Sequence, residues 1–291
     1  MTEPATGTRR FKERIGTFEL SGKAARGGRA DLPVILAIHG GTYNCDYFDV
    51  PGHSLIDRAT KAGFDIVAID RPGYGDSTRL PETDAIIRAN AVVLNDALPH
   101  LLARLDLADR PVFVIGHSIG GAIALTLASL QPDWRLTGVA VSGVGAETPP
   151  EDAGNYAHLP QQYLVELPTP MKDAVMFGPE GSHPADMPQA SHLANTLVPR
   201  AELIDITGGW KDRVAGIAAS IKVPVHYRQA EHEKLWLNSQ DHVGAFGRLF
   251  TASPRVDAAM VANAGHCIDY HNAGEAFQKD QLEFAAACSK T

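Results

Sequence analysis

The chain has 291 residues, of which 44% are hydrophobic and 21% charged, a composition typical of a globular protein rather than a disordered one. It carries 26 Lys and Arg against 34 Asp and Glu, and the resulting net charge of −8 argues against nucleic acid or an anionic membrane surface as the partner. No apolar stretch reaches the ~18 residues of a membrane span, and we see no secretory signal in the sequence. Three scattered cysteines, Cys45, Cys267 and Cys288, are typical of reduced cytoplasmic thiols and do not form a zinc-binding pattern. We therefore expect a cytoplasmic globular protein without a metal site.

Short β-branched apolar runs recur along the chain and predict buried strands. They lie at residues 33–38, 65–69, 111–115, 136–141, 223–227 and 255–261, and residues 15–20 indicate an additional edge strand. Runs that are almost continuously apolar are typical of parallel strands that are covered on both faces.

Helical patterns alternate with these runs. They lie at residues 54–62, 84–105, 119–130, 240–250 and 273–288. The alternation predicts an α/β fold with a mostly parallel, doubly wound sheet. In such sheets ligands bind at the carboxyl ends of the strands, so we look for the chemistry there.

One long stretch, residues 145–221, breaks this alternation and is rich in proline. A structureless loop of this length is improbable inside a compact domain. Apolar side chains such as Tyr163, Met176 and Leu197 also argue against disorder. We therefore expect a core domain in two parts, 1–144 and 222–291, separated by a helical cap at 145–221.

The most informative motif is Gly116-His117-Ser118-Ile119-Gly120. It is a Gly-x-Ser-x-Gly sequence directly after a predicted strand and directly before a predicted helix. This context is the one that a nucleophile elbow requires, with the serine hydroxyl exposed above the sheet. The motif therefore predicts Ser118 as a nucleophile, with the N-terminus of the following helix directed at the site.

A second motif, His39-Gly40-Gly41, follows the first strongly apolar strand. Acyl transfer needs hydrogen-bond donors directed at the oxyanion that develops in the transition state. A glycine loop at the end of a strand can offer backbone N–H groups for this purpose. We assign the oxyanion hole to the N–H groups of Gly41 and Ile119.

Taken together, the motifs resemble those of the α/β-hydrolase superfamily, in particular its cap-bearing members with a serine nucleophile. Four segments carry the resemblance, in the family's order and at roughly its spacing: 39–41, 70–77, 116–121 and 264–266. It covers the chain from about Pro33 to Cys288, apart from the divergent stretch at 145–221. The resemblance implies the α/β-hydrolase fold, no metal or organic cofactor, and a structural turn at 70–77.

The resemblance also implies a histidine base after the last strand and an acid after the strand before it. A serine is a poor nucleophile without such a base. We assign the base to His266, with His271 as the other local candidate. Glu233 stands where the family's pattern has Asp, so we assign it as the acid that orients the base; Glu231 and then Asp241 are the alternatives.

Five further side chains are candidates for the substrate pocket. They are Tyr43 beside the oxyanion loop, His117 beside the nucleophile, and Met171, Met176 and Phe177 in the expected cap. The three cap residues indicate an apolar or amphipathic ligand.

These residues predict a serine hydrolase that cleaves a carboxylic ester or lactone, with a thioester as a further option, through an acyl-enzyme on Ser118. Its partner is a small-molecule acyl substrate. The alternatives are an acyltransferase, a lyase or a cofactor-free haloperoxidase on the same fold, or a ligand-binding relic of it. The family's epoxide hydrolases and haloalkane dehalogenases attack with Asp at the elbow, and Ser118 argues against both. The oligomeric state cannot be predicted from the sequence.

Overall fold

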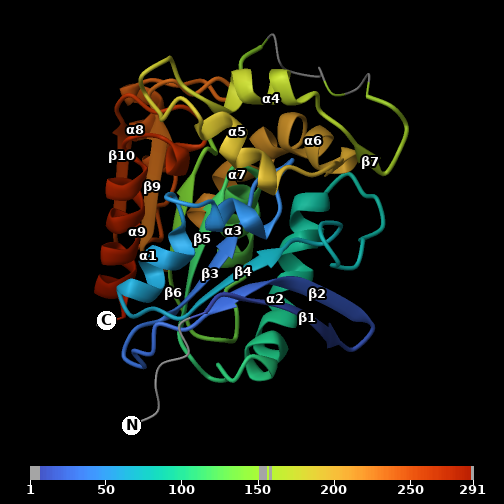
Figure 1. The fold of residues 1–291 in the computed structure, drawn as a ribbon, viewed down its shortest axis with the longest axis vertical. Helices are drawn as coiled ribbons and strands as arrows, with labels where there is room; N and C mark the ends of the chain where they lie inside the picture. Colours follow the sequence, from blue (N-terminus) through green and yellow to red (C-terminus); the bar gives the residue numbers. More distant parts are fainter. Residues whose placement is uncertain (1–6, 151–155, 157–158, 290–291) are drawn as a thin grey trace.

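The computed structural model describes residues 7–150, 156 and 159–289. Eight of its strands build the main sheet (Figure 1). In spatial order the strands are β1 (Arg9–Ile15), β2 (Phe18–Ala25), β4 (Ile66–Asp70), β3 (Val34–Ile38), β5 (Val112–His117), β6 (Leu136–Ser142), β9 (Val225–Ala230) and β10 (Val256–Val261). Strand β2 runs antiparallel to both of its neighbours, and the pairs from β4 to β10 are parallel. The predicted mostly parallel sheet is therefore confirmed.

The expected single edge strand at 15–20 is wrong, because this range spans the end of one strand, a turn and the start of the next strand. Residues 16 and 17 form a turn between β1 and β2, with Gly16 at φ 61°. A left-handed φ of this kind is what glycine adopts without steric cost. The polar sequence before Ile15 hid β1, because an exposed edge strand lacks the apolar run that marks a buried one.

Side chains that alternate along each strand fill two separate cores, one on each face of the sheet. In β3, Ile35 and Ala37 belong to one core, whereas Leu36 and Ile38 belong to the other. Helices α2 (Ile86–Arg104), α3 (Ile119–Ser129) and α7 (Trp210–Ala219) cover the face of Leu36. Helices α1 (Leu55–Lys61) and α9 (Gly274–Cys288) cover the opposite face, and α8 (Gln240–Arg248) packs beside β10.

Local sequence signals explain where several helices begin. The Ser54 hydroxyl accepts a hydrogen bond from the Asp57 N–H (3.0 Å) at the start of α1. Ser239 caps α8 in the same way, through the N–H of His242 (3.2 Å). Side-chain capping of this kind satisfies one of the free N–H groups at a helix start. The short 3₁₀ helices η1 (Cys45–Asp49), η3 (His192–Ala194) and η4 (Ile268–Tyr270) lie in the connections.

The inserted segment, residues 145–221, contains short elements that gather at the carboxyl end of the sheet (Figure 1). They are α4 (Thr169–Met176), α5 (Met187–Ser191), α6 (Arg200–Thr207) and the antiparallel pair β7 (Leu164–Val165) and β8 (Val198–Pro199). Residues 151–155 and 157–158 of the expected cap lie outside the described residues. The last helix, α7, instead packs against α3, with Trp210 fully buried in the core.

Candidate active site

Ser118 occupies the turn between β5 and α3 with φ 55° and ψ −125°. A non-glycine residue in this region is strained, and such strain persists only where the surroundings hold it. The Ser118 N–H donates to the Ser142 carbonyl (2.8 Å), and the Ser118 carbonyl accepts from the Gly121 N–H (2.8 Å). The sequence-predicted elbow is therefore present as a strand, a strained turn and a helix.

Two glycines permit this close packing of strand and helix. A Cβ at Gly116 would lie 2.5 Å from the Gly120 carbonyl oxygen, and a Cβ at Gly120 would lie 2.2 Å from the Ile38 carbonyl oxygen. Contacts this short against backbone atoms are not tolerated, so both positions require glycine.

His266 follows β10 and hydrogen-bonds to the carboxylate of Glu233, which follows β9. The His266 Nδ1 lies 2.9 Å from Oε1 and 2.8 Å from Oε2, and both side chains are completely shielded from solvent. Because an ionised carboxylate only accepts hydrogen bonds, Nδ1 carries the proton and Nε2 is a free acceptor. Among the described residues, Nε2 is buried and has no hydrogen-bond partner.

Ser118 follows β5 and His266 follows β10, and β6 and β9 lie between these two strands in the sheet. The ring of His266 lies against the ring of His117, the residue before Ser118, with 4.8 Å between the centroids. A Cβ at Gly143 would lie 2.9 Å from the Cε1 of His266. The imidazole therefore occupies the space next to the elbow that a glycine leaves open.

The alternatives to these two residues have other partners. Glu231 accepts the N–H of Asn263 (2.8 Å), and Asp241 is exposed at the start of α8. His271 ends the short turn η4; its Nε2 accepts the N–H groups of Gly178 and Gly265, at 2.9 Å each. Among the carboxylates considered, Glu233 alone contacts His266 within the described part of the chain.

The carboxylate of Glu233 is further held by the backbone of the two residues that follow it. Its Oε1 accepts the N–H groups of Lys234 (3.0 Å) and Leu235 (2.9 Å). The negative charge is thus compensated by several donors in a buried site, as buried carboxylates require.

Gly41 and Ile119 line the same cavity as Ser118. Neither backbone N–H donates to another group within the described residues. Such free, fixed donors beside a serine are what stabilisation of an oxyanion needs.

A buried ion pair lies directly behind the Gly41 loop. Arg71 contacts Glu202 through Nη1–Oε1 (2.5 Å) and Nη2–Oε2 (2.9 Å), and both side chains have no exposed surface. The same guanidinium donates from Nε to the His39 carbonyl (2.9 Å) and from Nη2 to the Gly40 carbonyl (3.1 Å). Tyr74 adds a hydrogen bond from its hydroxyl to Glu202 (2.7 Å).

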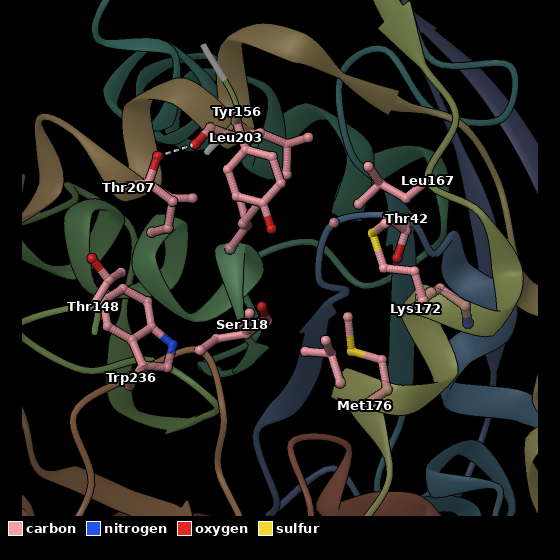
Figure 2. A pocket seen from close by; sticks show the side chains of 16 residues that line it. Thr42, Ser118, Thr148, Tyr156, Leu167, Lys172, Met176, Leu203, Thr207 and Trp236 are labelled. Carbon is pink, nitrogen blue, oxygen red and sulfur yellow. Dashed lines mark hydrogen bonds between the residues drawn. The ribbon is translucent and has the colours of Figure 1, made fainter. Parts of the chain in front are cut away.

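The cavity over Ser118 has a volume of about 100 Å³ and is shown in Figure 2. Ser118, Ile119, Gly41 and Thr42 form one side of it, at the carboxyl ends of β3 and β5. Mostly apolar side chains form the rest: Thr148, Tyr156, Leu167, Met171, Lys172, Val175, Met176, Leu203, Ile206, Thr207, Leu235 and Trp236. Most of these residues belong to the inserted segment.

Of the five residues predicted for the pocket, Met171 and Met176 line this cavity, whereas Tyr43, His117 and Phe177 do not. Tyr43 is fully buried behind the pocket wall, with its hydroxyl 3.6 Å from the Cys267 Sγ.

His117 and Phe177 are likewise packed away from the cavity. His117 stacks on Tyr47, with 4.7 Å between centroids, and burial holds the pKa of its imidazole well below the ordinary value. Phe177 packs against His183 at 4.9 Å. Both side chains are therefore packed in the interior, where aromatic side chains bury large areas.

Lys172 is the charged residue among those lining the cavity, but its amine is directed away from Ser118 (Figure 2). Its Nζ donates to the Tyr43 hydroxyl (3.0 Å) and to the Asn195 Oδ1 (2.6 Å). Burial lowers the pKa of this amine. The cavity thus presents little charge to a ligand.

Sequence reasoning missed Leu203, Ile206 and Trp236, which line the cavity, and the Arg71–Glu202 pair behind it. Trp236 follows Glu233 by three residues, and its Nε1 donates to the Gly143 carbonyl (2.9 Å). Its closeness in sequence to the predicted acid could have indicated that Trp236 lies at the site. No local pattern marks the α6 residues, because their positions depend on how the inserted segment folds back.

Among the described residues, no group of three or more His, Cys, Asp or Glu side chains is arranged to hold a metal ion. In the same part of the chain, no helix combines the length and the apolar character needed to cross a membrane. Cys45, Cys267 and Cys288 are buried, and none of them forms a disulfide within the described residues.

The family model described as "Alpha/beta hydrolase family" matches residues 34–277. The chain belongs to the alpha/beta hydrolase family. Over 143 residues, this α/β hydrolase is 32% identical to an sn-1-specific diacylglycerol lipase of Mus musculus, covering 48% of this chain and 42% of the lipase. It is also 32% identical over 120 residues to phospholipase YtpA of Bacillus subtilis (strain 168), covering 39% and 42% of the two chains. The matches thus span less than half the length of these curated relatives.

Solved structures resemble the α/β hydrolase over nearly its whole length. A thermophilic esterase from Thermogutta terrifontis superimposes with a TM-score of 0.69 at 19% identity, covering 97% of this chain and 99% of the esterase. An E-2-(acetamidomethylene)succinate hydrolase superimposes with a TM-score of 0.68 at 21% identity, covering 96% of this chain and 99% of that hydrolase. At such low identities these likenesses show the fold alone.

Proposed function

We propose that this α/β hydrolase is a serine esterase that forms an acyl-enzyme on Ser118. The observation that carries the proposal is the buried His266–Glu233 pair beside the strained Ser118 turn. A serine becomes a useful nucleophile when a base is held ready to take its proton. The lipase, phospholipase and esterase names among the matched proteins support the same reaction class.

In the proposed mechanism, His266 Nε2 takes the proton of the Ser118 hydroxyl as the oxygen attacks the ester carbonyl. The N–H groups of Gly41 and Ile119 donate to the resulting oxyanion. His266 then gives its proton to the leaving alkoxide, and the alcohol departs. Glu233 keeps the Nδ1 proton in place and stabilises the imidazolium that forms. Water, activated by the same histidine, then releases the acid and restores Ser118.

The cavity favours a small and neutral acyl group. A dry apolar cavity of about 150 Å³ holds one benzene molecule of six carbon atoms, so a volume of about 100 Å³ has room for about four non-hydrogen atoms by the same proportion. The amine of Lys172 is engaged by Tyr43 and Asn195, so no free charge is presented to an anionic acyl group. We infer carboxylic esters of short fatty acids as the preferred substrates, with small lactones and thioesters cleaved by the same steps.

We also propose that the part of the inserted segment from β7 to α6 acts as the cap of the pocket. Its residues Leu167, Met176, Leu203 and Ile206 supply most of the apolar wall. The last helix of this segment, α7, belongs to the core by its packing against α3. The cap in this proposal therefore ends before Trp210.

The test is hydrolysis of p-nitrophenyl esters of two to twelve acyl carbons by wild type and Ser118→Ala. We expect the highest kcat/KM at two to four carbons and no hydrolysis above background by the variant. A fluorophosphonate probe should add one adduct to the intact mass of wild type and none to that of Ser118→Ala. Wild type that neither reacts with the probe nor hydrolyses any ester would overturn the serine esterase. A maximum at eight or more carbons would overturn only the acyl-chain assignment.

A further inference from the structure

The Arg71–Glu202 pair joins the inserted segment to the loop that carries the proposed oxyanion donor. Glu202 belongs to α6, whose next residue, Leu203, lines the pocket. Arg71 follows β4 directly and touches the carbonyl groups of His39 and Gly40. Both charged groups are fully buried. A buried pair of this kind gives little net stability compared with apolar residues of the same size, so its geometry calls for another explanation.

The orientation of one peptide group provides that explanation. The Gly40 carbonyl and the Gly41 N–H belong to the same peptide, and the structure contains no cis peptide bond in its described residues. In a trans peptide the two groups point in opposite directions. Because the Gly40 carbonyl is directed at the Arg71 guanidinium (3.1 Å), the Gly41 N–H is directed away from it, on the side where Gly41 borders the cavity of Ser118.

His39 reinforces the same orientation. Its Nδ1 lies 2.7 Å from the Gly40 carbonyl oxygen, and its Nε2 accepts the backbone N–H of Arg71 at 3.2 Å. Nδ1 therefore carries the proton and the imidazole is neutral. Burial, together with the charge of Arg71, holds the pKa of His39 well below its ordinary value. The Gly40 carbonyl thus has two donors that fix it from behind.

We propose that Arg71, held by Glu202 of α6, is a positioning residue that aims the Gly41 N–H at the oxyanion of the reaction. The guanidinium suits this task because its planar fork can contact two carbonyl groups and a carboxylate at once, which a lysine amine cannot do with the same geometry. Glu202 ties that fork to the inserted segment. The packing of α6 over the pocket and the alignment of the oxyanion donor therefore depend on one another.

The inference rests on the proposed function, because it needs a reaction with an oxyanion. The experiment replaces both charges together, Arg71→Met with Glu202→Leu, so that no unpaired charge is left buried. We measure kcat and KM for p-nitrophenyl acetate, the inhibition constant of 1,1,1-trifluoro-2-butanone, and the Tm. The ketone forms a tetrahedral adduct with a serine and reports the oxyanion hole separately from substrate binding.

We expect the double variant to keep a KM within about threefold of wild type and to lose about 100-fold in kcat, the effect of removing one oxyanion donor. The inhibition constant of the ketone should rise in proportion to the loss of kcat/KM. The control is Arg110→Met, which removes an ion pair with Asp65 before the amino ends of β4 and β5. That variant should keep kcat and the ketone affinity whatever its change in Tm.

The Arg71→Lys variant keeps the positive charge and guards against a double variant that fails to fold. It should lower kcat by about tenfold, because a single amine replaces the forked contact. A folded double variant or Arg71→Lys with kcat and ketone affinity within about twofold of wild type would overturn the positioning role. Wild type that hydrolyses no ester would overturn the proposed function itself, and with it this role.

Discussion

One side of the pocket is backbone at the carboxyl ends of β3 and β5, whereas the other side is side chains from α4 and α6. The backbone side carries Gly41, Ser118 and Ile119, which follow the paired strands β3 and β5 of a buried sheet. The side-chain side is built of short helices, which no strand pairing holds in place. Substitutions on the first side should therefore change the chemistry, and substitutions on the second should change which acyl group is accepted.

The largest effect is expected at Glu233, the proposed acid. Glu233→Gln keeps the size of the side chain but no longer fixes the Nδ1 proton of His266, so kcat should fall by about 10⁴-fold, as for other triads with this change. Glu231→Gln is the matched control, because the Glu231 carboxylate accepts the N–H of Asn263 (2.8 Å) and not a bond from His266 within the described residues, so kcat should be unchanged. Steady-state kinetics on p-nitrophenyl acetate measure both. An active Glu233→Gln enzyme would contradict the assignment of the acid.

The next largest effect is expected on the pH dependence of stability and concerns His271, which links Gly178 of the inserted segment to Gly265 after β10. Burial lowers the pKa of His271 to about 4, below the value near 6.5 of an unfolded chain. The neutral ring accepts two N–H groups, so its contribution to stability is complete above pH 6.5 and is lost as the pH falls towards 4. This loss amounts to about 3 kcal/mol. Urea unfolding measures the free energy of unfolding at pH 7 and at pH 4. The decrease between the two pH values should be smaller by that amount in His271→Gln than in wild type. An equal drop in both proteins would rule out this role.

A smaller effect is expected on the side-chain side. Leu203→Ala enlarges the cavity, so the ratio of kcat/KM for an octanoate ester to that for an acetate ester should rise about tenfold, a typical discrimination for apolar contacts in a pocket. Leu127→Ala is the control, because Leu127 is fully buried in α3 and does not line the cavity. It should lose stability without altering the ratio. If this ratio is the same in both variants, α6 does not select the acyl group.

The smallest effect is expected from Lys172→Met. The amine lies behind the pocket wall, on Tyr43 and Asn195, and contributes nothing to a neutral ester. We expect kcat/KM for p-nitrophenyl butyrate to change by less than about threefold, which is under 1 kcal/mol. A loss of more than tenfold, confined to one class of ester, would instead place the amine in the substrate site.

The two sides also differ in how far the sequence could predict them. The sheet was predictable because parallel strands covered on both faces are apolar at almost every position, as in Val34–Ile38 and Val112–His117. The Ser118 turn was predictable because it needs glycines at fixed positions. The segments around β7, α4 and α6 were not, because short helices carry weak periodicity and their packing is decided by distant contacts. Glu202 shows this well: nothing near it in the sequence indicates that it pairs with Arg71, 131 positions away.

One contact described above also limits how this protein can be re-engineered. Gly178 and Gly265 approach so closely that a Cβ on Gly265 would lie 2.3 Å from the Gly178 nitrogen, and both N–H groups converge on the Nε2 of His271. A chimaera that replaces the inserted segment with one from another protein must therefore preserve the contact of these three residues, which lies next to His266 in the sequence. Libraries that vary the inserted segment should keep Gly178, Gly265 and His271 constant and randomise α4 and α6 instead.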